Sequence, residues 1–142
     1  PVVVMLAAMI PVGQALETSG ISLSIANFIS ASTAGMALPW LILMILVITM
    51  FVSDIVNNAA TAVIMAPIAA NLAIQVGQPV EPFLMAVAVG ASCAFLSPIG
   101  HQCNTLVMAP GNYKFGDYWR LGLPLECVIV AISIPMILFV WT

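Results

Sequence analysis

The sequence predicts an all-helical integral membrane protein. Of its residues, 63% are hydrophobic and only 5% are charged, whereas a soluble domain carries about 25% charged residues. The charged side chains are far apart, and residues 18–53, 55–80 and 82–113 contain none. A helix needs roughly 20 apolar residues to cross the hydrocarbon core, so each stretch is long enough to enter the membrane. No basic patch marks nucleic acid as a partner.

The first two apolar segments cover residues 1–16 and 21–30. The first starts at Pro1 with no basic region and no small-residue cleavage site, so it is not a signal peptide. We interpret the chain as a fragment whose upstream part is missing. Residues 17–20 supply turn chemistry between the two segments, and the breaker-rich stretch 31–35 ends the second.

The third and fourth segments, 39–52 and 60–76, are separated by a polar cluster. Pro39 suits the first turn of a helix, and Gly77 begins a turn after the fourth segment. The third segment would form a helix about 20 Å long, which is shorter than the roughly 30 Å hydrocarbon core. Short apolar segments of this kind are typical of broken helices in secondary transporters.

The fifth segment, 82–96, is also short, and the last segment, 121–141, is a long apolar helix. The fifth would be about 22 Å long before residues 97–100 break it with proline and glycine. Unwound backbone at membrane depth is tolerated only where it lines a cavity or is buried in protein. The breaks therefore favour a binding site over a plain helical bundle.

Each break carries a polar cluster, at residues 53–61 and 97–105. Polar groups at membrane depth are costly and usually functional. Hydroxyls, amides and free carbonyls suit a hard cation such as sodium, and a helix N-terminus after a break favours an anion. We expect the two clusters to lie side by side near the membrane midplane. The alternative for each is a polar loop in water, and for the second also a kinked helix with a satisfied histidine.

A catalytic or metal-binding role is the least favoured interpretation of the polar residues. Such a site would need Asp54, His101 and Cys103 to converge, and a metal site needs three or four ligands. The other cysteines, Cys93 and Cys127, lie in apolar runs and are interpreted as small buried hydrophobes. We therefore predict no enzyme, no catalytic residue and no metal beyond sodium.

At these two clusters the sequence resembles the second repeat of the divalent-anion/sodium symporter family, within the ion transporter superfamily. In that family a hairpin tip carries Ser-Asn-Thr, followed by small residues and a proline. Here Asn57, Asn58 and Ala59 stand at the tip, with Pro67 behind them. The family's broken-helix loop, Pro-x-Ala-Thr-Pro-Pro-Asn, corresponds to residues 98–104.

The resemblance implies a dimeric transporter with inverted repeats that works by an elevator motion. Residues 1–142 would be the C-terminal half of its transport domain, the second inverted repeat. It would contain a re-entrant helical hairpin at 39–76, a broken transmembrane helix at 82–110 and a last transmembrane helix at 121–141. The missing N-terminal repeat would supply the other sodium site and the remaining substrate contacts.

The resemblance also assigns site residues. The sodium site would use Ser53, the carbonyl of Val56, Asn58 and the carbonyl of Gly100. The substrate site would use Asn58, Ala59, His101, Gln102 and Asn104. The family's tip threonine is Ala59 here and its loop threonine is His101, so the sequence leaves the substrate and the coupling ion open.

The predicted function is secondary active transport of a small anion, sulfate-like or a di- or tricarboxylate, coupled to sodium and without an organic cofactor. The alternative is a metalloid or anion efflux permease of the same superfamily, coupled to protons or to an ATPase; an intramembrane enzyme or metal protein comes third. We predict a multi-pass protein of the cell or inner membrane. Lys114 and Arg120, the two basic residues, place the loop Gly111–Arg120 in the cytoplasm.

Overall fold

The computed structural model describes residues 11, 14–15, 18–32 and 35–141 of the chain. Within these residues every regular element is a helix, which confirms the predicted all-helical class. The first predicted segment, 1–16, lies almost entirely outside the described residues. The helices are α2 (Ile21–Ser32), α3 (Leu38–Ile55), α4 (Asn58–Gln75), α5 (Glu81–Ser92), α6 (Gln102–Met108) and α7 (Phe115–Trp141).

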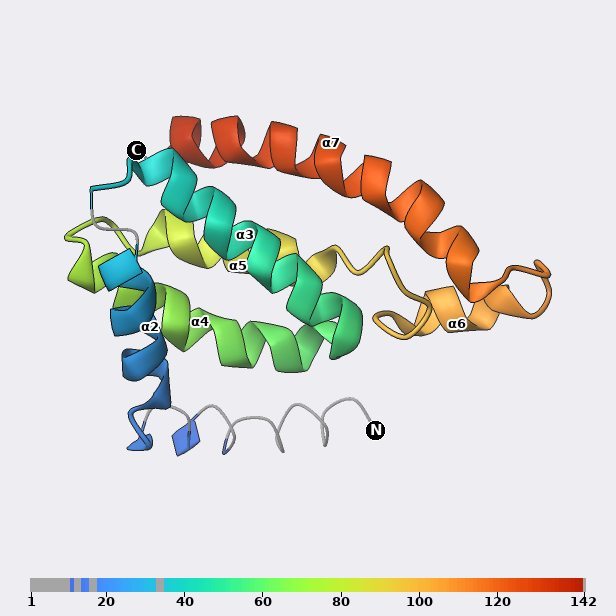
Figure 1. Cartoon of the computed structure of the whole chain (residues 1–142), viewed down its shortest axis with the longest axis horizontal. Coiled ribbons are helices and arrows are strands. Elements are labelled where there is room, and N and C mark those ends of the chain that lie inside the picture. Colours follow the sequence, from blue (N-terminus) through green and yellow to red (C-terminus); the bar gives the residue numbers. More distant parts are fainter. Residues whose placement is uncertain (1–10, 12–13, 16–17, 33–34, 142) are drawn as a thin grey trace.

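Three helices, α3, α4 and α5, lie alongside one another and form the body of the molecule (Figure 1). Helix α2 packs on α4, and the long α7 runs along α3 and α5. The α4–α5 turn and the C-terminal end of α7 lie at one end of the molecule in Figure 1, and the α6–α7 connection lies at the other. This arrangement puts the α3–α4 tip and the end of α5 together between those two ends.

The core is apolar and lies where α3, α4 and α5 meet. Ile45 and Leu46 of α3, Leu72 of α4 and Phe83 of α5 are fully buried there. Gly90 allows α5 to approach α3 closely, because a Cβ at this position would lie 2.9 Å from the Leu46 carbonyl oxygen. The contact fixes the end of α5 against the middle of α3.

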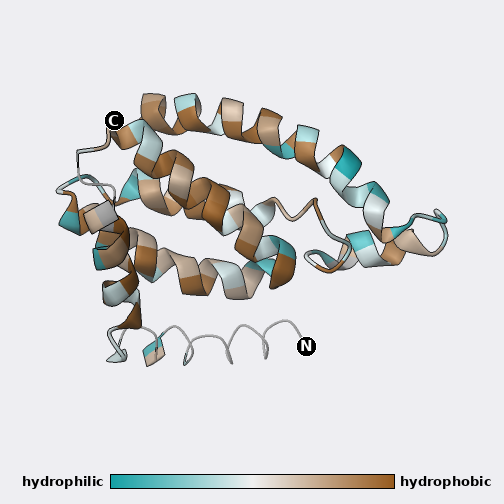
Figure 2. Ribbon diagram, in the orientation of Figure 1, coloured by the Kyte–Doolittle hydropathy of each residue, from teal (hydrophilic) through white to brown (hydrophobic). Residues whose placement is uncertain are grey.

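Helices α3, α4 and α7 are long and apolar enough to cross a membrane, and α5 is shorter. Helix α7 has 27 residues, of which only Gly122 and Ile137 are buried. Its remaining surface is mostly apolar (Figure 2), as expected of a helix that faces lipid. Helix α4 is less apolar than α3, since it carries three amide side chains, at Asn58, Asn71 and Gln75.

Helix α3 is longer than the sequence predicts. It begins at Leu38 and continues through Ser53 and Asp54 to Ile55, a total of 18 residues, or about 27 Å. The polar residues remain helical because other elements bind their side chains. The Ser53 hydroxyl donates to the Ala91 carbonyl, and the Asp54 carboxylate accepts from the Leu96 backbone. By length alone α3 could therefore cross the membrane, and the re-entrant hairpin remains a prediction.

The helices around the second break also differ from the predicted boundaries. Helix α5 ends at Ser92 because Cys93 leaves the helical region, with φ −106° and ψ 68°. Helix α7 begins at Phe115, six residues earlier than predicted, because the Asp117 carboxylate accepts the backbone N–H of Lys114 and caps the first turn. Arg120 therefore lies in a helix rather than in the predicted loop.

Candidate functional site at the junction of two helix breaks

The first break is the connection between α3 and α4. Asn57 has an extended backbone, and its side-chain Oδ1 accepts the Ala60 backbone N–H at 2.8 Å. It is thus the N-cap of α4, a position that asparagine favours. The backbone N–H groups of Asn58 and Ala59 lie in the first turn, where a helix leaves its donors without intrahelical partners.

Ser53 links this tip to α5. Its side chain is completely buried, and its hydroxyl donates to the Ala91 carbonyl at 2.8 Å. The same hydroxyl oxygen lies 3.0 Å from Oδ1 of Asn58. Hydroxyl, amide and carbonyl oxygens from three helices are therefore gathered at one point.

The second break, residues 93–101, is fastened to the end of α3 by Asp54. The Leu96 N–H donates to Oδ1 of Asp54 at 3.0 Å, and the Ser97 hydroxyl donates to the Asp54 carbonyl at 2.6 Å. The Ser97 hydroxyl oxygen also accepts hydrogen bonds from the N–H groups of Ile99 and Gly100, at 3.2 and 3.1 Å. Asp54 thus holds the loop with both its side chain and its main chain.

Gly100 brings the loop backbone into contact with α3. A Cβ on Gly100 would lie 2.9 Å from the Ser53 carbonyl oxygen and 2.8 Å from the Cβ of Ala94. The structure therefore brings together Ser53, Asn58 and Gly100, all predicted sodium ligands. The fourth, Val56, is the C-cap residue of α3 and lies in the short connection to Asn58.

The residues predicted to contact substrate are placed less uniformly. Ala59 is half-buried in the first turn of α4. His101 is exposed and caps α6, where its Nδ1 accepts the Cys103 N–H at 3.2 Å. The imidazole ring is therefore paired with a backbone N–H group. Gln102 is the first residue of α6, and its side chain lies outside the described residues.

Asn104 closes the loop between α5 and α6. Its amide nitrogen donates to the carbonyls of Ala94 and Ser97, at 2.9 and 3.1 Å. An asparagine amide has two N–H donors, and these bonds engage both. A contact from Asn104 to an anion would therefore require the loop to give up one of them.

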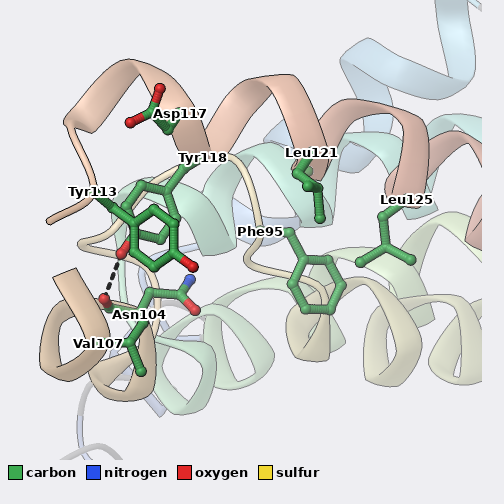
Figure 3. A pocket seen from close by; sticks show the side chains of 9 residues that line it. Phe95, Asn104, Val107, Tyr113, Asp117, Tyr118, Leu121 and Leu125 are labelled. Carbon is green, nitrogen blue, oxygen red and sulfur yellow. Dashed lines mark hydrogen bonds between the residues drawn. The ribbon is translucent and has the colours of Figure 1, made fainter. Parts of the chain in front are cut away.

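A cavity of about 440 Å³ lies beside Asn104, between α6 and α7. Figure 3 shows Phe95, Leu121 and Leu125 lining one part of it, and Tyr113 and Tyr118 lying near Asn104. The Tyr118 hydroxyl donates to the Asn104 carbonyl at 2.7 Å. The lining is mainly apolar and its one charged member, Asp117, is acidic, so this cavity does not suit an anion.

Ser97, Tyr118 and Glu126 are site residues to which the sequence assigned no role. Ser97 precedes a proline, and a serine there is a turn initiator whose hydroxyl binds nearby backbone groups, so its role was open to prediction. Glu126 is the one charge in the apolar stretch 121–141, and that pattern marks a functional position. Nothing in the sequence indicates that the Tyr118 hydroxyl would bind the backbone of α6.

The residues of the enzyme alternative are engaged separately. Asp54 binds the backbone of Leu96, and His101 binds the backbone of Cys103. In the described part of the chain no group of three or more His, Cys, Asp or Glu side chains could hold a metal ion.

The comparisons with known proteins place the chain among membrane transporters. A model of a family described as citrate transporter matches residues 1–142. The chain belongs to the citrate transporter family. This confirms the resemblance to sodium-coupled anion symporters, because relatives are named as sodium/sulfate and dicarboxylate cotransporters. The family and these relatives are transporters rather than enzymes, and the chain is an integral membrane protein.

Three relatives are similar over nearly the whole chain. An uncharacterized transporter of Synechocystis is 38% identical over 96% of the chain and 22% of the relative. Sodium/sulfate cotransporter 2 of Chlamydomonas reinhardtii is 31% identical over 90% of the chain and 15% of the relative. Sodium-dependent high-affinity dicarboxylate transporter 3 of Caenorhabditis elegans is 30% identical over 92% of the chain and 23% of the relative. The chain thus spans about a fifth of the length of these relatives.

Proposed function

We propose that this chain forms one half of the transport site of a sodium-coupled carrier for a small anion, either sulfate-like or a di- or tricarboxylate. The observation that carries the proposal is the meeting of the two helix breaks, where Ser53, Asn58 and Gly100 lie together. The names of the relatives, which include sodium/sulfate and dicarboxylate cotransporters, support both the cation and the class of substrate.

The chemistry at the junction fits sodium. The hydroxyl of Ser53, the amide oxygen of Asn58 and the carbonyls of Val56 and Gly100 are uncharged oxygen donors, which a hard cation accepts as ligands. Loop backbone supplies such carbonyls only where a helix is broken. A sodium ion here would bridge the Ser53 hydroxyl oxygen and the Asn58 amide oxygen, which now lie 3.0 Å apart.

The start of α4 fits an anion. The first-turn N–H groups of Asn58 and Ala59 lie at the positive end of an 18-residue helix, where negative charge is stabilised. Asn58 can serve both ions, because a neutral amide offers an oxygen to sodium and an N–H to the substrate. His101 and Gln102 would approach the same anion from the second break.

A re-entrant hairpin is supported by the position of the α3–α4 tip along α7. Leu96 binds Asp54 near the tip, and the backbone of Phe95 and Leu96 packs against Gly122 of α7. Helix α7 continues from Gly122 back to Phe115, a further distance of about 10 Å. The tip therefore lies beside α7 and not beyond its first turn, and we propose that this position is within the membrane, as an elevator-type site requires.

The remaining substrate and sodium contacts belong to the N-terminal repeat, and we propose that the complete transporter is a homodimer. A sodium-coupled symporter and an efflux permease differ in which ion gradient drives them. The coupling ion is therefore the property to measure.

The test is uptake of sulfate and of succinate by the full-length transporter in proteoliposomes, driven by a sodium gradient. Asn58→Ala is expected to abolish uptake, because it removes an oxygen from the cation and an N–H from the anion. Asn71→Ala is the matched control, since Asn71 lies on the same helix and its amide contacts Ser22 of α2. Uptake by Asn58→Ala at the wild-type rate, or uptake driven by a proton gradient and not by sodium, would contradict the proposal.

A further inference from the structure

Two carboxyl groups next to the junction each keep one buried oxygen without a hydrogen-bond partner. They are Oδ2 of Asp54 on α3 and Oε1 of Glu126 on α7. Asp54 is only 6% exposed, and its Oδ1 is already used by the Leu96 N–H. An unpaired buried acceptor is costly, and more so when it is charged. A cation or a hydrogen-bond donor beside these two oxygens would offset the cost of their burial.

The two carboxyl groups are neighbours. Leu96, which binds Asp54, lines a cavity of about 420 Å³ between α3 and α7 together with Glu126. Asp54 and Glu126 thus flank the same short stretch of backbone, because Leu96 binds Asp54 on one side and the Phe95–Leu96 backbone packs against Gly122 of α7 on the other. The basic side chains of the described residues, Lys114 and Arg120, are exposed in and near the first turns of α7, and neither donates to these oxygens.

We propose that Asp54 and Glu126 bind a monovalent metal cation, sodium, at a site separate from the one formed by Ser53, Asn58 and Gly100. This inference rests on the proposed sodium-coupled transport. Two carboxylates near each other in apolar surroundings cannot both remain ionised without a compensating charge. A sodium ion supplies that charge and takes oxygen ligands.

The geometry favours a metal cation over a single shared proton. No hydrogen bond joins the two unpartnered oxygens, so one proton would satisfy one of them and leave the other unpaired, whereas a metal ion takes several oxygen ligands. The cavity beside Glu126 is otherwise apolar. Glu126 is the one charged residue in its lining.

The test is sodium binding to the purified full-length transporter, measured as the rise in its thermal unfolding midpoint. Sodium replaces choline at constant ionic strength, and the rise follows from binding to the folded state alone. We expect Glu126→Gln to raise the sodium concentration for half the effect by about tenfold, because it removes one of two charged ligands. Asp54→Asn should do the same, and the double variant should lose little more, since either carboxylate alone holds the ion poorly.

Glu81→Gln is the control, because Glu81 is an exposed carboxylate in the first turn of α5, and its titration should match the wild type. Superimposable sodium titrations of Glu126→Gln and wild type would overturn the proposal. So would a wild-type midpoint that responds to pH through Glu126 and not to sodium. The measurement needs no transport, so a protein that binds sodium at this pair but carries no anion would refute only the proposed function.

Discussion

Gly100 is the residue on which the junction of the two breaks depends most directly. Its backbone lies against the Ser53 carbonyl and the Cβ of Ala94, at distances that leave no room for a side chain. Because both neighbours are held, Ser53 by Ala91 and the loop by Asp54, neither can retreat easily. The close contact and the proposed sodium site are therefore parts of the same arrangement.

Gly100→Ala is expected to weaken sodium coupling. The added Cβ overlaps the α3 backbone, and overpacking of this kind costs about 1–3 kcal/mol, which the structure can relieve only by moving Gly100 away from Ser53. The sodium concentration for half-maximal uptake should rise in the full-length protein. Ile99→Ala, at the exposed neighbouring position, should leave it unchanged. A normal sodium dependence in Gly100→Ala would show that the Gly100 carbonyl is not a ligand.

At the scale of elements, α7 is held to the second break by one close backbone contact. A Cβ on Gly122 would strike the Phe95 carbonyl oxygen, whereas a Cβ on Gly116, in the same helix, would meet nothing within 4 Å. Together with the bond from Tyr118 to Asn104, this contact fixes the position of α7 along the loop. The two glycines therefore provide a matched pair of variants.

Gly122→Ala and Gly116→Ala are expected to shift stability in opposite directions. The first pushes α7 away from the Phe95–Leu96 backbone and should lower the free energy of unfolding by about 1–3 kcal/mol. The second replaces an unconstrained helical glycine and should be neutral or raise it by up to about 1 kcal/mol. Thermal unfolding of the full-length protein in detergent measures both, and equal effects would argue against the α7 contact.

The sequence predicted the elements where a proline or glycine acts locally and missed boundaries that tertiary contacts decide. Pro39 marks the start of α3 and Gly77 the turn after α4. The extension of α3 through Asp54 depends on the loop around Leu96, which is distant in sequence. The contact between the two breaks could be expected from their polar clusters. The hydrogen bond from the Leu96 N–H to Asp54 could not, because a carboxylate in a sequence does not indicate which backbone N–H it will accept.

At the scale of the whole molecule, the two basic residues and the α4–α5 turn lie at opposite ends. Lys114 precedes α7 at one end, and the turn after Gly77 lies at the other (Figure 1). If the bias toward cytoplasmic basic residues holds here, these ends face opposite sides of the membrane. The C-terminal end of α7 lies with the α4–α5 turn.

The expected orientation is checked by labelling single cysteines in intact cells, after Cys93, Cys103 and Cys127 have been replaced by serine or alanine. A membrane-impermeant thiol reagent should label Gln78→Cys from outside, because Gln78 is exposed in the α4–α5 turn. Lys114→Cys should react only after the cells are opened. Labelling of both positions from the same side would refute the opposed ends, and the reverse pattern would invert the orientation.

The lower apolar content of α4 has a consequence for how the chain is made. A translocating segment enters the bilayer according to its own apolarity, and the amides at Asn58, Asn71 and Gln75 make α4 the weakest of the three long helices in this respect. Helix α3, which precedes it by a two-residue connection, is strongly apolar. During synthesis a strongly apolar helix therefore precedes a weakly apolar one. We expect α4 to insert into the membrane together with α3 and not on its own.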